Sequence, residues 1–121
     1  MASVDVVTKA NAGLVGLAGF VDTEIVKIRI GQGHWVILGR VMIHQTDGDF
    51  QWIRAKILHD QNVVLDQIGY QVRPGWNGCL ALQATLLSKE RQSITLECHT
   101  YSGFAYSGSL VAFSVDSIDV Q

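Results

Sequence analysis

Residues 34–44 read His-Trp-Val-Ile-Leu-Gly-Arg-Val-Met-Ile-His, and this stretch decides the fold class. Its apolar side chains recur at period two, which is the repeat of a β-strand rather than of a helix. One face carries Trp35, Ile37, Val41 and Ile43, and the other carries Val36, Leu38 and Met42. An antiparallel strand normally has one face in water, so a strand that is apolar on both faces calls for a second covering layer. We expect Trp35, which leads the strand, to be buried structure.

The same period extends over nearly the whole chain and predicts an all-β protein. The expected strands are Ser3–Thr8, Thr23–Ile30, His34–His44, Gln51–Asp60, Val63–Gln71, Leu80–Ser88, Ser93–Tyr101 and Ser109–Ile118. Ala10–Phe20, which contains three glycines, reads as an irregular or broken strand. Leu80–Ser88 is rich in helix formers, but its alternation and short length favour a strand. Eight short strands separated by turns predict a two-sheet antiparallel jelly-roll sandwich of about eight to ten strands.

Length and composition predict one soluble domain that associates with copies of itself. The 121 residues suffice for a single domain, 1–121, and are too few for two independent cores. Charged residues make up 17% of the chain, below the roughly 25% of an average globular domain. Ser109–Ile118 is also apolar on both faces, and a neighbouring copy would supply the missing layer for it and for His34–His44. A solvated monomer is the alternative.

Several partners are disfavoured by charge and hydropathy. The net charge is −2 and the basic residues are scattered singly, so we expect no nucleic acid partner. No apolar run approaches the roughly 18 residues of a membrane span. Met1 to Lys9 lacks the basic and apolar regions of a secretory signal, so we expect a cytoplasmic protein by default or one exported by a non-classical route.

Three stretches resemble the tumour-necrosis-factor-like family, which includes the complement globular-head domains and small bacterial stand-alone members. They are GHWVILGRV (33–41), ITLECHTY (94–101) and LVAFSV (110–115), and with their spacing they cover about Val21 to Ile118. The glycine-and-aromatic signatures of the animal members are not recognisable, so nothing receptor-specific carries over. The resemblance implies a jelly roll that assembles as a homotrimer about its doubly apolar strands, with ligands between protomers or on apical loops. Galectin-like sandwiches and viral-capsid jelly rolls are the competing folds.

Catalysis is not indicated by the candidate nucleophiles and bases. The four histidines, His34, His44, His59 and His99, lack persuasive partners in sequence, and no nucleophile-elbow motif is present. Glu97 and His99 share a strand face, which is more typical of a solvated surface than of a catalytic pair. We therefore predict that the protein is not an enzyme, with a site built on His99 or His59 and a nearby carboxylate as a weak alternative.

The cysteines and the acidic loop give weak signals for a disulfide or a metal. Cys79 and Cys98 lack the spacing of a zinc site or redox pair, so we expect two buried thiols, with a disulfide as the alternative. Asp47-Gly48-Asp49 offers two hard oxygens, but Ca²⁺ needs six to eight ligands. Asp47 and Asp49 are thus weak calcium candidates, and the expectation is a structural turn with no cofactor.

Aromatic residues beside polar ones are the stronger signal for a ligand. Trp52 shares an outer strand face with Arg54, Trp76 lies in a loop with Arg73, and His99 shares a face with Tyr101. An aromatic ring stacks on the apolar face of a sugar while charged or amide groups bind its hydroxyls, which is the usual composition of a small-ligand site. For Trp52 itself, anchoring a subunit interface, where Trp and Arg are enriched, is favoured over stacking on a ligand.

These patterns predict a non-enzymatic binding module. The first hypothesis is a trimeric lectin-like protein that recognises a carbohydrate or a similar small polar ligand between protomers. The alternative is a structural trimerisation or appendage protein without a small ligand. A calcium-dependent recognition head is a weaker alternative.

Overall fold

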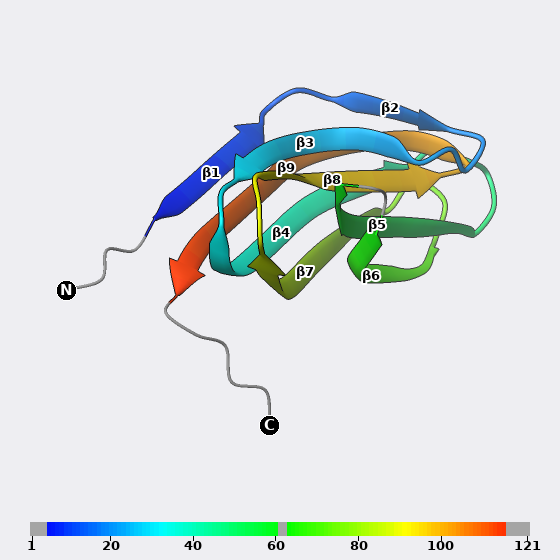
Figure 1. The fold of residues 1–121 in the computed structure, drawn as a ribbon. Helices are drawn as coiled ribbons and strands as arrows, with labels where there is room; N and C mark the ends of the chain where they lie inside the picture. Colours follow the sequence, from blue (N-terminus) through cyan, green and yellow to red (C-terminus); the bar gives the residue numbers. More distant parts are fainter. Residues whose placement is uncertain (1–4, 61–62, 116–121) are drawn as a thin grey trace.

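The chain is a two-sheet β-sandwich, as the alternating pattern predicts. In the computed structural model, residues 5–60 and 63–115 are described, and they form nine strands (Figure 1). The strands are β1 (Val6–Asn11), β2 (Val15–Ala18), β3 (Thr23–Ile30), β4 (Gly33–Gln45), β5 (Gln51–His59), β6 (Val63–Val72), β7 (Asn77–Ser88), β8 (Gln92–Thr100) and β9 (Ser102–Val115). No helix long and apolar enough to cross a membrane occurs in these residues.

The order of the strands is that of a jelly roll. One sheet runs β1–β9–β4–β7, with β2 pairing further along β9, and the other runs β3–β8–β5–β6. Every pairing is antiparallel. Since β1 and β2 both pair with β9, they act as one first strand that is interrupted between Asn11 and Val15. The predicted jelly-roll sandwich and its number of strands are confirmed.

The core lies between the two sheets and is built from the inward positions of each strand. Its fully buried aliphatic side chains include Ile37, Val41, Ile43, Ile53, Ile57, Leu80, Ile94, Leu96 and Leu110. Trp35 is also buried, as predicted, and its indole nitrogen donates to the carbonyl of Gly31 at 3.0 Å. Pairing that N–H removes the cost of burying it, so the ring fills the core at the start of β4.

The last strand differs from the prediction because two of its glycines do not mark turns. We expected this strand to begin at Ser109, but β9 begins at Ser102 and runs through Gly103 and Gly108. A Cβ on Gly103 would overlap the carbonyl oxygen of His44, and a Cβ on Gly108 would lie 2.5 Å from Ile25 Cγ2. The ladder to β4 shifts register just before Gly108, at a β-bulge where Ser107 has φ of 53°. Both glycines are therefore sites of close approach inside a strand.

Other boundaries move by a few residues, and one burial prediction is wrong. The first strand is Val6–Asn11 rather than Ser3–Thr8, and residues 3–4 and 116–118 of the expected strands lie outside the described residues. Leu80–Ser88 is part of strand β7, which begins at Asn77. Cys98 is buried but Cys79 is exposed, and both thiols are free. Cys79 directly precedes Leu80, which points into the core, so the alternation of the strand turns the thiol outward.

Replacing Gly103 by alanine should destabilise the protein by about 3 kcal/mol, because the new methyl group can be accommodated only if β4 and β9 separate. The free energy of unfolding is measured by chemical denaturation, with circular dichroism as the signal. Gly48→Ala is the matched control, since a Cβ there meets no atom within 4 Å. Equal stability of the two variants would contradict the close approach.

Candidate functional site

Four turns meet at one end of the sandwich and are tied together by backbone hydrogen bonds. The connections β2–β3, β4–β5, β6–β7 and β8–β9 all lie at this end (Figure 1). The amide of Gly19 donates to the carbonyl of Tyr101 at 2.8 Å, that of Thr46 to Ser102 at 2.9 Å, and that of Gln45 to Trp76 at 3.1 Å. These bonds link each turn to another, so the four turns form one connected surface.

This end of the sandwich carries the exposed aromatic side chains of the described residues, and we call it the aromatic end. They are Phe20, Phe50, Trp52, Trp76 and Tyr101, and each is more than 40% exposed. Exposed large apolar groups that gather in one place mark interaction surfaces more often than scattered ones do. The aromatic end is therefore the first candidate site for a ligand or partner.

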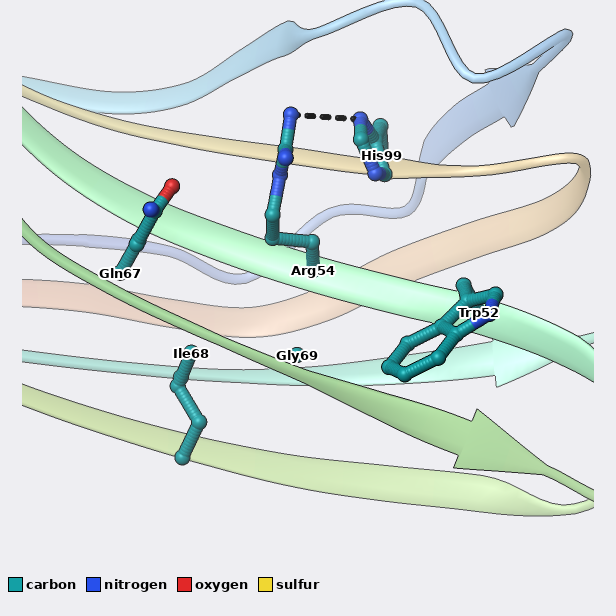
Figure 2. A pocket seen from close by; sticks show the side chains of 6 residues that line it. All are labelled: Trp52, Arg54, Gln67, Ile68, Gly69 and His99. Atoms are coloured by element: carbon teal, nitrogen blue, oxygen red, sulfur yellow. Dashed lines mark hydrogen bonds between the residues drawn. The ribbon is translucent and has the colours of Figure 1, made fainter.

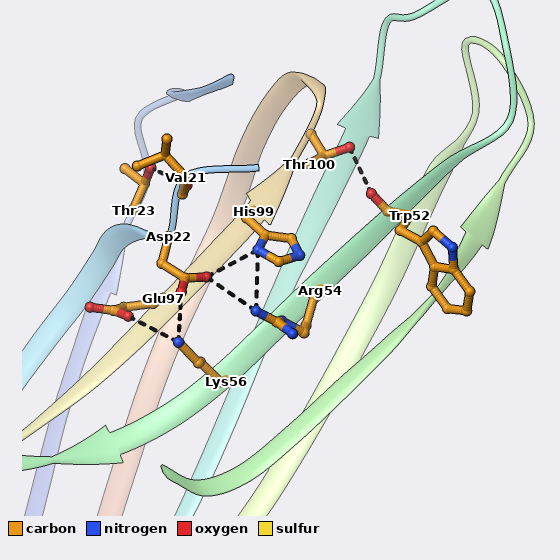
Figure 3. A network of polar contacts seen from close by, with 9 residues as sticks. All are labelled: Val21, Asp22, Thr23, Trp52, Arg54, Lys56, Glu97, His99 and Thr100. Carbon is orange, nitrogen blue, oxygen red and sulfur yellow. Dashed lines mark hydrogen bonds and ion pairs between the residues drawn. The ribbon is translucent and has the colours of Figure 1, made fainter. Parts of the chain in front are cut away.

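A network of charged side chains lies next to the aromatic end, on the outer face of the four-stranded sheet (Figure 3). Asp22 stands at its centre, with Lys56 Nζ 2.7 Å from Oδ2 and His99 Nδ1 3.1 Å from Oδ1. Arg54 Nη2 lies 3.7 Å from the same Oδ1, and Lys56 Nζ also lies 3.8 Å from Glu97 Oε1. The network joins the start of β3 to β5 and β8.

The network changes the pKa values of two of its members. Burial acts to raise the pKa of Asp22, but the hydrogen bond and charge of Lys56, with the charges of His99 and Arg54, outweigh it and lower that pKa below its ordinary value. Burial lowers the pKa of His99, the charge of Arg54 lowers it further, and Asp22 opposes both. His99 is therefore neutral at pH 7.

A neutral His99 leaves Arg54 with few hydrogen-bond partners. The ring carries one hydrogen, so Nδ1 either donates to Asp22 at 3.1 Å or accepts from Arg54 Nη2 at 3.4 Å. We assign the hydrogen to the shorter contact with the carboxylate. Arg54 Nε is buried and has no hydrogen-bond partner in the described chain. In the described residues Nε thus has no partner, while Nη2 faces His99 and Asp22 at 3.4 and 3.7 Å.

A hollow of about 310 Å³ opens between Arg54 and Trp52 (Figure 2). It is lined by Trp52, Arg54, Gln67, Ile68, Gly69 and His99, and we call it the Gly69 hollow. Gly69 pairs with Arg54 across the β5–β6 ladder, and its missing side chain leaves the floor open. An aromatic wall with a few placed polar groups is the usual composition of a small-ligand site.

The predicted ligand residues fall into two groups. Trp52, Arg54 and His99 line the Gly69 hollow together, and Tyr101 lies next to them, because the ring of Phe20 contacts His99 and Tyr101 with centroid distances of 5.6 and 5.8 Å. Arg73 and Trp76 do not line the hollow. Instead the Arg73 guanidinium lies 5.3 Å above the Trp76 ring in a cation–π contact.

The acidic loop is arranged as a turn. Asp47 Oδ2 accepts a hydrogen bond from Gln51 Nε2 at 2.9 Å, and the carbonyl of Asp49 accepts one from Gln45 Nε2 at 2.8 Å. Among residues 5–60 and 63–115 no three His, Cys, Asp or Glu side chains stand close enough to hold a metal ion. The loop therefore shows the hydrogen bonding of a structural turn.

Sequence reasoning missed Asp22, Gln67 and Gly69. Asp22 comes just before a strand and gives no signal of its own. Gln67 and Gly69 reach the site because the β5–β6 ladder shifts register between Ile57 and Leu58. Simple hairpin pairing from the turn would place Ile68 opposite Arg54, whereas the shift places Gly69 there. The alternation of Ile68 and Tyr70 with Gln67, Gly69 and Gln71 was the one signal in the sequence that could have assigned Gln67 and Gly69 to the outer face.

The outer face of the five-stranded sheet is a second candidate site, of a different kind. Its outward positions, read from the ladders, are Val6, Thr8, Ala10, His34, Val36, Leu38, Arg40, Met42, His44, Asn77, Cys79, Ala81, Gln83, Thr85, Leu87, Phe104, Tyr106, Ser109, Val111, Phe113 and Val115. We call this surface the apolar face, since Arg40 is the one Arg, Lys, Asp or Glu among these positions. The other sheet carries the ion network on its outer face, so the two faces differ sharply in charge.

Comparison with known proteins finds the fold but not a family. No protein-family model matches the chain, and no curated protein matches it. A structure of infectious bursal disease virus, Gx strain, matches with a TM-score of 0.63 and 17% identity over 93% of this chain and 33% of that one. The VP2 subviral particle of the same virus matches with a TM-score of 0.61 and 15% identity over 92% and 33%. The chain thus spans about a third of the chains it matches.

At this level of identity the likeness shows a shared β-sandwich fold. Viral jelly rolls were one of the competing folds in the sequence analysis, and they are the ones that the comparison finds. The jelly-roll fold that the tumour-necrosis-factor-like resemblance implied is present, but no protein-family model or curated protein matches the chain to that family.

Acidification should destabilise the protein through His99. Because the pKa of His99 is lowered in the folded state, the unfolded chain takes up this proton first as the pH falls below about 6.5, and stability falls with it. Urea midpoints measured between pH 7.5 and 5 should decrease less steeply in His99→Gln than in the unmodified protein. His34→Gln, outside the network, should keep the original slope. The same slope in His99→Gln would contradict this assignment.

Proposed function

We propose that this protein is a non-enzymatic structural subunit that assembles with copies of itself through the apolar face. The single observation that carries the proposal is the composition of that face, where a broad sheet surface holds one charged residue. Val6, Leu38 and Leu87 are each more than 40% exposed on it. A large contiguous apolar surface is typical of a protein interface, whose centre is depleted in charge and enriched in aromatic residues and Met.

Two features of the apolar face support a head-to-tail contact between copies, and three is the number of copies that the resemblance implies. Phe104, Tyr106 and Phe113 stand on β9, while a hollow of about 520 Å³ opens toward β7 beside Leu38 and Ala81. These rings are half-buried, and the hollow is also lined by Arg40 and Asp66, so the two parts of the face differ and one copy can contact a different part of the next. Such a head-to-tail contact closes into a ring when the rotation permits.

The free edge of β7 is not available for strand pairing, which favours assembly through the face. Asp66 Oδ2 of β6 accepts a hydrogen bond from the amide of Gln83 at 3.1 Å. The hydroxyl of Tyr70 donates to the carbonyl of Cys79 at 3.1 Å. Side chains thus occupy backbone groups that an added strand would need, which is a known protection of edge strands.

The fold comparison adds to this proposal. The matched structures include a VP2 subviral particle and T=1 particles derived from the virus, so proteins with this fold build assemblies. We transfer to this chain the capacity for self-assembly, with the trimer as the expected unit.

Light scattering tests the assembly. The unmodified protein should have a mass near three times 13.3 kDa, about 40 kDa. Leu38→Glu should reduce the mass to one chain, since it places a charge in the middle of the apolar face. Val64→Glu is the matched control, because Val64 is exposed to 43% against 42% for Leu38 but lies on the other sheet. A monomeric unmodified protein would refute the proposal.

Cys79 provides an independent probe of the same face. It lies on the apolar face, while burial raises the pKa of the Cys98 thiol to about 12 and makes that thiol unreactive. Alkylation of Cys79 should therefore be slow in the assembled protein and several times faster in Leu38→Glu. Equal rates would show that the assembly leaves this part of the face open.

A second candidate function is the binding of a carbohydrate or similar small polar ligand at the aromatic end. The observation that favours it is the Gly69 hollow, where three of the residues expected to bind a ligand come together. Binding in several copies on one assembly would raise avidity without a new contact.

Tryptophan fluorescence tests this second function. A bound sugar should change the emission, and Trp52→Ala should remove the change while leaving the mass of the assembly unaltered. Loss of the assembly in Trp52→Ala, without any sugar response in the unmodified protein, would instead assign Trp52 to a subunit interface.

A further inference from the structure

The Gly69 hollow has a shape that depends on the absence of one side chain. On the outer face of the four-stranded sheet, Gly69 stands between Gln67 and Gln71 and opposite Arg54. A Cβ built on Gly69 would lie 2.9 Å from the carbonyl oxygen of Ile53 and 3.4 Å from Cβ and Cγ of Arg54. The position therefore disfavours a side chain, and the absence of one keeps the hollow above Gly69 open.

Trp52 forms one wall of the hollow. Its side chain is 53% exposed, and its carbonyl accepts a hydrogen bond from the buried Thr100 Oγ1 at 2.9 Å. This hydrogen bond ties the backbone of Trp52 to β8, and the indole that projects from it offers an exposed flat face for a ligand. The C–H groups on one side of a pyranose ring form an apolar surface suited to such a face.

Arg54 gives the hollow its charge preference. It is the one charged residue of the lining, and its Nε is buried without a partner in the described residues. Of the carboxylates nearby, Asp22 is bound by Lys56 at 2.7 Å and lies 3.7 Å from Arg54 Nη2, longer than a hydrogen bond. Glu97 lies 3.8 Å from the amine of Lys56. A guanidinium with free donors matches the two oxygens of a carboxylate. The Gln67 amide adds a donor and an acceptor for hydroxyl groups.

We propose that the Gly69 hollow binds a saccharide through a hexuronic acid residue, with the pyranose ring stacked on Trp52 and its carboxylate bound by Arg54. This inference rests on the second candidate function and specifies its ligand class. It is independent of assembly through the apolar face, which lies on the other sheet.

Calorimetric titration with two glycosides tests the proposal. Methyl β-D-glucuronide and methyl β-D-glucoside differ only at C6, which is a carboxylate in the first and a hydroxymethyl group in the second. The glucuronide should bind about ten- to a hundredfold more tightly, because a charge-assisted hydrogen bond replaces a neutral one. N-acetylglutamate amide, titrated in parallel, offers the carboxylate without the ring and should bind at least tenfold more weakly than the glucuronide.

Three variants separate the parts of the site. Arg54→Gln should lower the affinity for the glucuronide to that for the glucoside. Gly69→Ala should lower the affinity for both glycosides, because the added methyl group fills the floor of the hollow. Arg29→Gln is the control, because it removes an exposed arginine of β3 that lies on the outer face of the four-stranded sheet but outside the hollow. This variant should bind both glycosides with the affinity of the unmodified protein. If Gly69→Ala fails to fold, Arg54→Gln still decides the question.

Each outcome has a distinct meaning. Equal affinity of the two glycosides, or an undiminished preference in Arg54→Gln, overturns the hexuronic acid assignment and leaves sugar binding standing. Binding of N-acetylglutamate amide as tight as that of the glucuronide also overturns it, in favour of an acidic peptide. If neither glycoside binds, the second candidate function fails as well. The mass of the same samples by light scattering reports the assembly separately.

Discussion

The pairing of β4 with β9 is the constraint on which the rest of the structure depends. It joins residues 33–45 to residues 102–115 along the centre of the five-stranded sheet. β4 also pairs with β7, and β9 with β1 and β2, so these two strands carry every partner in that sheet. The pairing aligns Ile37 with Ala112 and places Gly103 against the backbone of His44. Separating the two strands would dismantle the sheet and expose one half of the core.

The outer faces of the two sheets differ in chemical character. Both contribute equally apolar inner faces to the core, but their outer faces differ. Among the positions of the apolar face, on the β1–β9–β4–β7 sheet, Arg40 is the one Arg, Lys, Asp or Glu, while the β3–β8–β5–β6 sheet presents the network centred on Asp22. One face is therefore suited to burial against another copy, and the other to water and polar ligands. The proposed assembly and the proposed ligand binding would therefore use different faces of the sandwich.

Much of the fold follows from local pattern because a β-sandwich core selects every second residue. The alternation around Trp35 and Ile37 predicted a strand apolar on both faces, and β4 is such a strand. The prediction of two buried thiols was wrong for Cys79. It rested on how often cysteine is buried in general and did not consider which face of the strand the alternation gives to Cys79. The last strand was placed too late because glycines inside a bulged strand look like turn residues in the sequence.

The sequence by itself determined the all-β class, the single jelly-roll sandwich, and the candidates Trp52, Arg54 and His99, since these depend on residue type and short-range period. Tertiary structure alone decided that these three meet at one hollow while Arg73 and Trp76 pair elsewhere. It also decided the position of Gly69, through a one-residue register shift in the β5–β6 ladder. Such a shift turns every following side chain to the opposite face, and it is set by packing against the whole core rather than by the strand's own residues.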